Sequence, residues 1–179
     1  MRLEKIVGQT SSLRFKQYKT GRVVKFRLKY DENTSLLYAM AKVLSVDGTH
    51  TYKATVVFKQ VAAQSKKTKV FPLEFFRKDG TPFYIEKPSY EHHIITRCQC
   101  LDFRHMWMWP DRPHKALLGK AIPYTRVAGS NRPPKNPKNI PGLCKHEIQV
   151  LRFMYKRNLL ITDGNLGLYL RRRYRKITR

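Results

Sequence analysis

The sequence contains few acidic residues. Twelve Asp and Glu stand against 37 Lys and Arg, which gives the 179-residue chain a formal net charge of +25. A chain with so large an excess of positive charge attracts polyanions. Solubility alone seldom requires such an imbalance. Nucleic acid is therefore the first candidate partner, and an acidic neighbouring protein in a large assembly is the second.

Long apolar runs are also missing. No segment approaches the roughly 20 apolar residues that a membrane-spanning helix needs. The first residues, Met1–Gly8, lack the apolar stretch of a signal peptide. We therefore expect no membrane span, and a chain that stays in a reducing cytoplasm or joins a particle assembled there.

Recognisable catalytic motifs are absent as well. The sequence has no Gly-rich phosphate loop, no paired-carboxylate motif and no Ser/His/Asp signature. We expect a protein that is not an enzyme and that takes no small-molecule substrate.

Cysteine is scarce, and its placement is the most specific feature of the chain. The three cysteines and one histidine form two pairs, Cys98-x-Cys100 and Cys144-x-His146, with 43 residues between them. A Cys3His set closes a tetrahedral zinc site and leaves no position for a substrate, which is typical of a structural Zn²⁺. Three unliganded buried thiols, an iron–sulfur cluster, or one disulfide with an odd thiol are the alternatives. A reducing compartment favours metal-bound thiolates over a disulfide.

The flanking residues predict where these ligands lie. Residues 92–97 are rich in β-branched side chains and read as a strand that runs into Cys98. A Pro-Gly pair at 141–142 breaks the chain before Cys144, and a helix follows with Ile148 and Leu151 on one face. Glu147 in its first turn suits the positive end of the helix dipole.

This order of strand, CxC, insertion and CxH at a helix start resembles the SWIM zinc-finger module, over about residues 92–157. The resemblance implies that Cys98, Cys100, Cys144 and His146 bind one structural zinc ion on a β-hairpin followed by a helix. The 43-residue insertion is longer than in most such modules. The segment "RPPKNPKNIPGLCKH" also resembles the SWIM-like part of certain tailed-bacteriophage virion proteins. That second resemblance implies a structural subunit of a virion, in its tail, baseplate, neck or head, assembled in the host cytoplasm.

The first half of the chain has a β pattern. Apolar and basic residues alternate over 24–30, a second strand candidate covers 36–46, although part of it is compatible with a helix, and its return strand covers 51–60. Strand-like segments at 70–76 and 83–85 flank an Asp-Gly turn at 79–80, like the Asp-Gly turn at 47–48. We expect an α+β fold in which an antiparallel meander of four or five strands leads into a zinc-stapled β-hairpin plus helix, with extended basic arms. The corresponding segments are an N-terminal arm (1–20), an antiparallel β region (21–91), a SWIM-like module (92–160) with its insertion (101–143), and a basic tail (161–179).

The insertion and the tail carry the candidate binding residues. The aromatic cluster 106–110 is interpreted as packing around the metal site or a partner, with base stacking as the alternative. The Pro/Asn/Lys run 131–141 is expected to be extended. The tail is expected to neutralise phosphates, to enter an acidic groove of a neighbouring subunit, or to remain solvated. The basic residues expected to contact a partner or nucleic acid are Arg132, Lys135, Lys138, Arg171, Arg172, Arg173, Arg175 and Lys176.

Two functions therefore follow from the sequence. The first is a non-enzymatic structural protein of a virion, stabilised by zinc and wedged among other subunits. The second is a zinc-dependent module that binds DNA or RNA. A ribonucleoprotein component is a third possibility that the charge alone allows.

Overall fold

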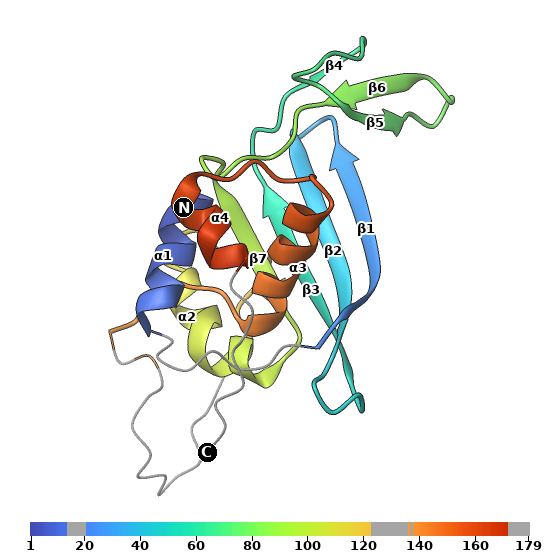
Figure 1. Cartoon of the computed structure of the whole chain (residues 1–179). Helices are drawn as coiled ribbons and strands as arrows, with labels where there is room; N and C mark the ends of the chain where they lie inside the picture. Colours follow the sequence, from blue (N-terminus) through green and yellow to red (C-terminus); the bar gives the residue numbers. More distant parts are fainter. Residues whose placement is uncertain (14–20, 123–135, 137, 172–179) are drawn as a thin grey trace, which may run out of the picture.

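The computed structural model describes residues 1–13, 21–122, 136 and 138–171 and confirms an α+β fold (Figure 1). A four-stranded antiparallel sheet lies at its centre, in the order β1-β2-β3-β7. Its strands are β1 (Val23–Asp31), β2 (Leu36–Leu44), β3 (Thr51–Phe58) and β7 (Ile94–Cys98). The meander predicted from the alternating pattern is therefore present.

The alternation in β1 holds except at its start. Phe26, Leu28 and Tyr30 are half-buried on the core side, but Val24 is 48% exposed. The pairing with β2 shifts by one residue between Val23 and Lys25, so Val24 is the extra residue of a β-bulge. Val23 takes its place opposite Val43.

The strands between β3 and β7 leave the meander. β4 (Ala63–Gln64), β5 (Leu73–Phe76) and β6 (Pro82–Ile85) form a second, three-stranded sheet in the order β4-β6-β5. We call it the distal sheet. In Figure 1 it lies beyond the end of β1 and β2. The predicted Asp-Gly turn joins β5 to β6, with Gly80 at a φ of 83°, a backbone conformation that glycine adopts without strain.

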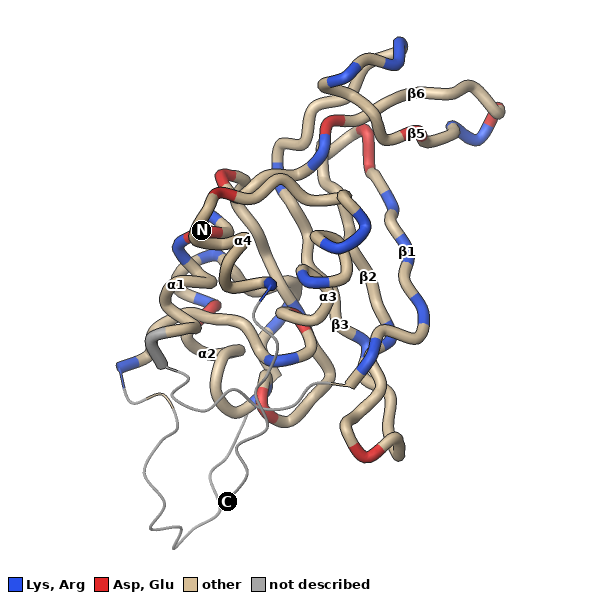
Figure 2. Tube along the Cα trace, viewed as in Figure 1, with Lys and Arg blue, Asp and Glu red and all other residues tan. Residues whose placement is uncertain are grey.

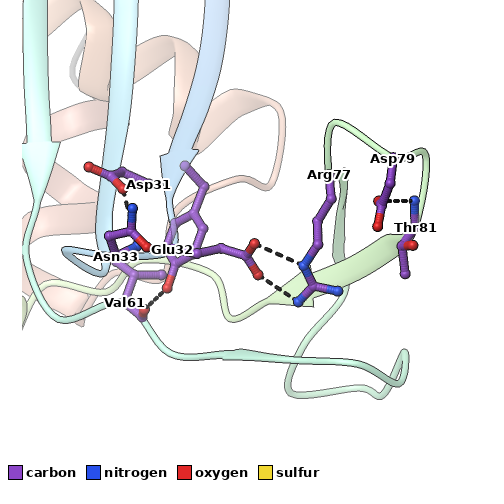
Figure 3. Close-up of polar contacts among 8 residues, drawn as sticks. Asp31, Glu32, Asn33, Val61, Arg77, Asp79 and Thr81 are labelled. Carbon is purple, nitrogen blue, oxygen red and sulfur yellow. Dashed lines mark hydrogen bonds and ion pairs between the residues drawn. The ribbon is translucent and has the colours of Figure 1, made fainter.

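Aromatic contacts and one ion pair join the distal sheet to β1. The Tyr30 ring lies 6.3 Å from the ring of Phe75 and 5.8 Å from that of Phe83, and its hydroxyl donates a hydrogen bond to Val61 O. Arg77 makes a two-pronged contact with Glu32, at 2.9 and 2.7 Å (Figure 3). This pair is exposed, so it contributes little to stability.

The helices cover one face of the four-stranded sheet (Figure 1). They are α1 (Leu3–Leu13), the π-helix η1 (Phe103–Trp107), α2 (Met108–Asp111), α3 (Lys145–Lys156) and α4 (Gly164–Arg171). The helix expected after Cys144 is α3, and its Phe153 ring packs 4.7 Å from that of Phe26. One hydrophobic cluster runs from α1 through the sheet to α4. None of the described helices is long and apolar enough to cross a membrane.

The described part of the N-terminal segment, residues 1–13, is not the extended arm expected over 1–20. Residues 3–13 form α1, and Leu3, Ile6 and Val7 are buried. Their spacing of i, i+3 and i+4 puts them on one helical face, and this face outweighs the polar composition of the segment. Leu3 N also donates to His92 O, and Ile94 N donates to Met1 O, which ties the helix start to β7.

The tail expected over 161–179 is also partly helical. The turn and apolar stretch at 162–170 form α4, which contacts α1 and α3 and buries Leu166 and Leu170. Asp163 begins this helix by accepting a hydrogen bond from Leu166 N at 2.7 Å. The apolar residues four apart therefore face the core rather than a partner.

Candidate metal centre

The structure brings the two predicted ligand pairs together. Cys98 ends β7, Cys100 follows it by two residues, Cys144 is the N-cap of α3, and His146 lies in the first turn of that helix. Their ligand atoms all lie within 4.8 Å of one another. Each side chain is at most 4% exposed. The four residues thus form a closed, buried group that is compatible with a metal ion.

The spacing of the donor atoms fits a tetrahedral ion. With Zn–S near 2.3 Å and Zn–N near 2.05 Å, a tetrahedron places sulfur and nitrogen about 3.5 Å apart. The distance from Cys98 Sγ to His146 Nδ1 is 3.7 Å. The other imidazole nitrogen, Nε2, is buried and has no hydrogen-bond partner among the described residues. An ion bound through Nδ1 would fix the imidazole in the tautomer that carries its proton on Nε2.

The thiols could not all ionise without a cation. Burial raises the pKa of the Cys144 thiol well above its ordinary value. The hydrogen bond to Cys100 raises the pKa of Cys98, while hydrogen bonds from Cys144 and Cys98 lower the pKa of Cys100. Further thiolates in this buried group therefore need a compensating positive charge, which a divalent cation would supply.

Neighbouring groups orient the ligands. Glu147 Oε2 accepts the Cys144 N–H at 2.8 Å, which fixes the start of α3. Phe103 N donates to Cys100 Sγ at 3.3 Å, so the first turn of the insertion folds against that sulfur. The Tyr52 ring lies 4.5 Å from the His146 ring and restricts its rotation.

The segment just before Cys144 is held by residues that the sequence did not single out. Leu143 N donates to Thr10 Oγ1 in α1, and Gly142 N donates to Asp111 Oδ1 in α2, both at 2.9 Å. A Cβ on Gly142 would lie 2.2 Å from Cζ3 of Trp107. Glycine is therefore needed for the indole to reach the backbone beside the site.

Two buried carboxyl groups lie next to the ligands. Burial raises the pKa of Asp111 to about 8. Burial, followed by the charge of Asp111, raises the pKa of Glu147 well above its ordinary value. Asp111 Oδ2 and Glu147 Oε1 have no hydrogen-bond partner among the described residues. Both groups thus remain protonated at pH values where an exposed carboxyl group is ionised.

The aromatic cluster of the insertion divides in two. Trp107 and Met108 are buried in η1 and α2, in agreement with packing around the site, whereas Trp109 is 40% exposed. The Arg112 guanidinium lies 5.9 Å from the centre of the Trp109 ring.

The described end of the Pro/Asn/Lys run is a turn rather than the extended chain expected there. Asn139 N donates to Asn136 O, and Asn139 has a φ of 48°. Asn136 is buried, and its amide donates to Met106 O and Ile140 O. Asparagine side chains replace backbone partners and tolerate this φ, which explains the turn.

The expected contact residues are only partly described. Lys138 is exposed beside this turn. Arg171 is exposed at the end of α4, where it donates to the Tyr155 hydroxyl and lies over the Tyr155 ring. The others lie outside the described residues: Arg132, Lys135, Arg172, Arg173, Arg175 and Lys176.

Comparison of the chain with protein-family models, with curated proteins and with solved structures gives no match.

Proposed function

We propose that the chain is a non-enzymatic structural protein in which one zinc ion, bound by Cys98, Cys100, Cys144 and His146, holds the helical layer to the sheet. The observation that carries this proposal is the burial of all four ligands, none more than 4% exposed. A substrate cannot reach a closed Cys3His site, so the ion would stabilise the fold rather than activate water.

The donor set favours zinc over other ions. Thiolates and imidazole are soft or borderline ligands, which disfavours Ca²⁺ and Mg²⁺. A single histidine among three cysteines around one point is the ordinary ligand set of structural zinc. An iron–sulfur cluster remains the alternative that elemental analysis tests.

A virion is the setting that we propose for this protein. The support is the resemblance of "RPPKNPKNIPGLCKH" to tailed-phage virion proteins, together with the net charge of +25. A basic subunit of this kind would sit in the tail, baseplate, neck or head among acidic neighbours. Mass spectrometry of purified particles should find the chain at a fixed copy number, and its consistent absence would contradict the proposal.

Elemental analysis of the purified protein tests the metal. We expect one zinc per chain, lost in Cys144→Ser and retained in His114→Ala, because His114 is an exposed histidine outside the cluster. Zinc retained in full by Cys144→Ser, or iron with inorganic sulfide in the wild type, would contradict the assignment.

Nucleic-acid binding is a second candidate function. The observation that favours it is a row of lysines, Lys25, Lys42 and Lys53, on the face of the four-stranded sheet opposite the described helices. Figure 1 shows these helices on the other face. Its test is a salt titration of binding to DNA of random sequence, since phosphate contacts weaken steeply with salt.

A further inference from the structure

The four-stranded sheet has one covered face and one basic face. The core side of β1 carries Phe26, Leu28 and Tyr30, with the Phe26 ring against Phe153 of α3 and the Tyr30 ring against the distal sheet. Side chains alternate along a strand, so the residues between them point the other way. We call this opposite side the outer face. Its basic residues are Lys25, Arg27, Lys29, Lys42, Lys53 and Arg97.

Three of these lysines are aligned across the sheet. Lys25 pairs with Lys42, and Lys42 pairs with Lys53, so the three are directly opposite on neighbouring strands. Like charges in directly opposite positions destabilise a sheet. All three side chains are exposed, and the arrangement lowers stability without any packing benefit. Local costs of this kind are typical of functional surfaces.

The next row continues the basic surface. Arg27 pairs with Met40, Met40 with Thr55, and Thr55 with Arg97. Arg97 donates to Leu118 O and Lys120 O at 2.8 and 2.9 Å, which directs its guanidinium to the β7 edge. The cations left for an external partner on this face are therefore the four lysines and Arg27.

Acidic side chains are confined to the ends of this face. Asp31 ends β1 and accepts hydrogen bonds from Asn33 N and Thr34 Oγ1. Asp47 lies in the β2–β3 turn and accepts a hydrogen bond from Thr49 N. Figure 2 shows basic residues recurring along β1 with acidic residues only near its end. No outer-face position of the four strands between these two ends carries an acidic residue.

A shallow depression lies in the middle of the lysines. Its volume is about 210 Å³, and it is lined by Lys25, Arg27, Lys42 and Lys53 around Met40 and Thr55. The cations thus surround a hollow rather than project from a ridge, which concentrates their field.

We propose that the outer face binds the phosphate backbone of nucleic acid, with Lys25, Lys42 and Lys53 as its central contacts. This inference rests on the second candidate function, nucleic-acid binding, and names the surface that would carry it out. Cations recur about 6.7 Å apart along a strand and about 4.8 Å apart across strands, a lattice suited to a chain of regularly spaced charges. Protein interfaces instead have an apolar centre and are depleted in lysine, whereas nucleic-acid interfaces are polar and strongly positive. Among the described residues that line the depression, Met40 is the only apolar side chain besides two alanines.

A matched pair of triple variants tests the proposal on the full-length, metal-loaded protein. The first is Lys25→Gln/Lys42→Gln/Lys53→Gln. The control is Lys66→Gln/Lys67→Gln/Lys69→Gln, which removes the same charge from exposed lysines in the segment between β4 and β5. Binding to single-stranded and duplex DNA 20-mers is measured by fluorescence anisotropy between 50 and 300 mM salt, on the order of the range over which phosphate contacts are screened.

The logarithm of the DNA association constant falls as the logarithm of the salt concentration rises. We expect this dependence to be less steep in the outer-face variant, with a slope smaller in magnitude by about 3, and the slope of the control to stay within about 1 of the wild type. Thermal melting of each variant checks that the fold persists. Equal losses of DNA affinity in the two variants would rule out the outer face as the binding surface, but the protein would still be a nucleic-acid-binding protein. A wild type that binds no DNA would overturn both. Competition by polyglutamate as effective as competition by DNA would identify an acidic protein as the partner and overturn the proposal.

Discussion

The two ends of this molecule are held together by different means. At the end that carries the candidate metal site, which we call the metal end, β7, η1 and the start of α3 meet around four buried cysteine and histidine side chains, and the adjoining chain is fixed by Thr10 and Asp111. At the other end, the distal sheet is joined through the ring of Tyr30, through the buried side chains of Phe83 and Ile85, and through an exposed ion pair. Leu73 and Phe75 are half-buried there, and Phe76 is 66% exposed.

The difference concerns where stability resides. Buried metal ligands contribute folding free energy directly, whereas exposed ion pairs contribute almost none. We therefore expect changes at the metal end to affect the whole helical layer, and changes in the distal sheet to stay local.

Loss of the metal should have the largest effect. Structural zinc contributes on the order of 10 kcal/mol of apparent binding free energy, comparable with the total stability of a domain. Chelation should raise hydrogen exchange of amides in η1 and α3 toward the unfolded rate, with a smaller change in β5 and β6. Equal acceleration in both regions would show one cooperative unit and would contradict the separation of the two ends.

Gly142→Ala should have the next largest effect. The new methyl group would meet the Trp107 ring at 2.2 Å, and forcing atoms into a packed core costs about 1–3 kcal/mol. Chemical denaturation measures the loss. Gly8→Ala is the matched control, because Gly8 lies in α1 with nothing within 4 Å of its added Cβ. That control should gain about 0.5–1 kcal/mol through helix propensity. A Gly142→Ala protein as stable as the control would refute the close approach.

Asp111→Asn should change how stability depends on pH. Its folded pKa of about 8 lies above the unfolded value, so its contribution is fully present below about pH 4 and declines as pH rises toward 8. The asparagine keeps an oxygen for Gly142 N and does not titrate. We expect the variant to gain stability relative to the wild type as pH rises from 5 to 8. The difference between the two proteins at each pH is measured by urea denaturation, which cancels the titration of the ligands. A constant difference would show that Asp111 is ionised throughout.

Arg77→Ala should have the smallest effect. The Arg77–Glu32 pair is exposed, and such pairs contribute about 0–1 kcal/mol. We expect the distal sheet to exchange slightly faster and α3 to be unchanged, with Lys78→Ala as the control for lost charge. A loss above about 2 kcal/mol would mean that the distal sheet supports the rest of the fold.

Local patterns predicted much of this structure. Alternating residues gave the positions of β1, β2 and β3, and the two Asp-Gly pairs marked hairpin turns that the structure contains. The spacing of cysteine and histidine identified the ligand group, because each pair is close in sequence.

The features that sequence reasoning missed depend on distant contacts. In the sequence Thr10 has no feature that distinguishes it from other polar residues. Only the structure shows that Leu143, 133 positions away, donates a backbone hydrogen bond to its hydroxyl. From the sequence Gly142 is interpreted as a turn residue, and only the structure shows that the Trp107 ring lies against it. The separate distal sheet was also missed, because strand patterns show which residues alternate but not which strands pair. The helical spacing in α1 was present in the sequence, but the polar composition of the segment obscured it.

The bond between Thr10 and Leu143 also bears on the order of events during synthesis. The β1–β2 and β2–β3 hairpins join neighbours in sequence and can form as soon as they leave the ribosome. Helix α1 is made before these hairpins, yet Leu143, which donates a hydrogen bond to its Thr10, is made later, just before the last two candidate ligands. Until Leu143 is made, the Thr10 hydroxyl therefore lacks this donor, although the start of the helix can already pair with residues 92–94. A chaperone that shields Leu3, Ile6 and Val7 over this interval would raise the yield of folded protein.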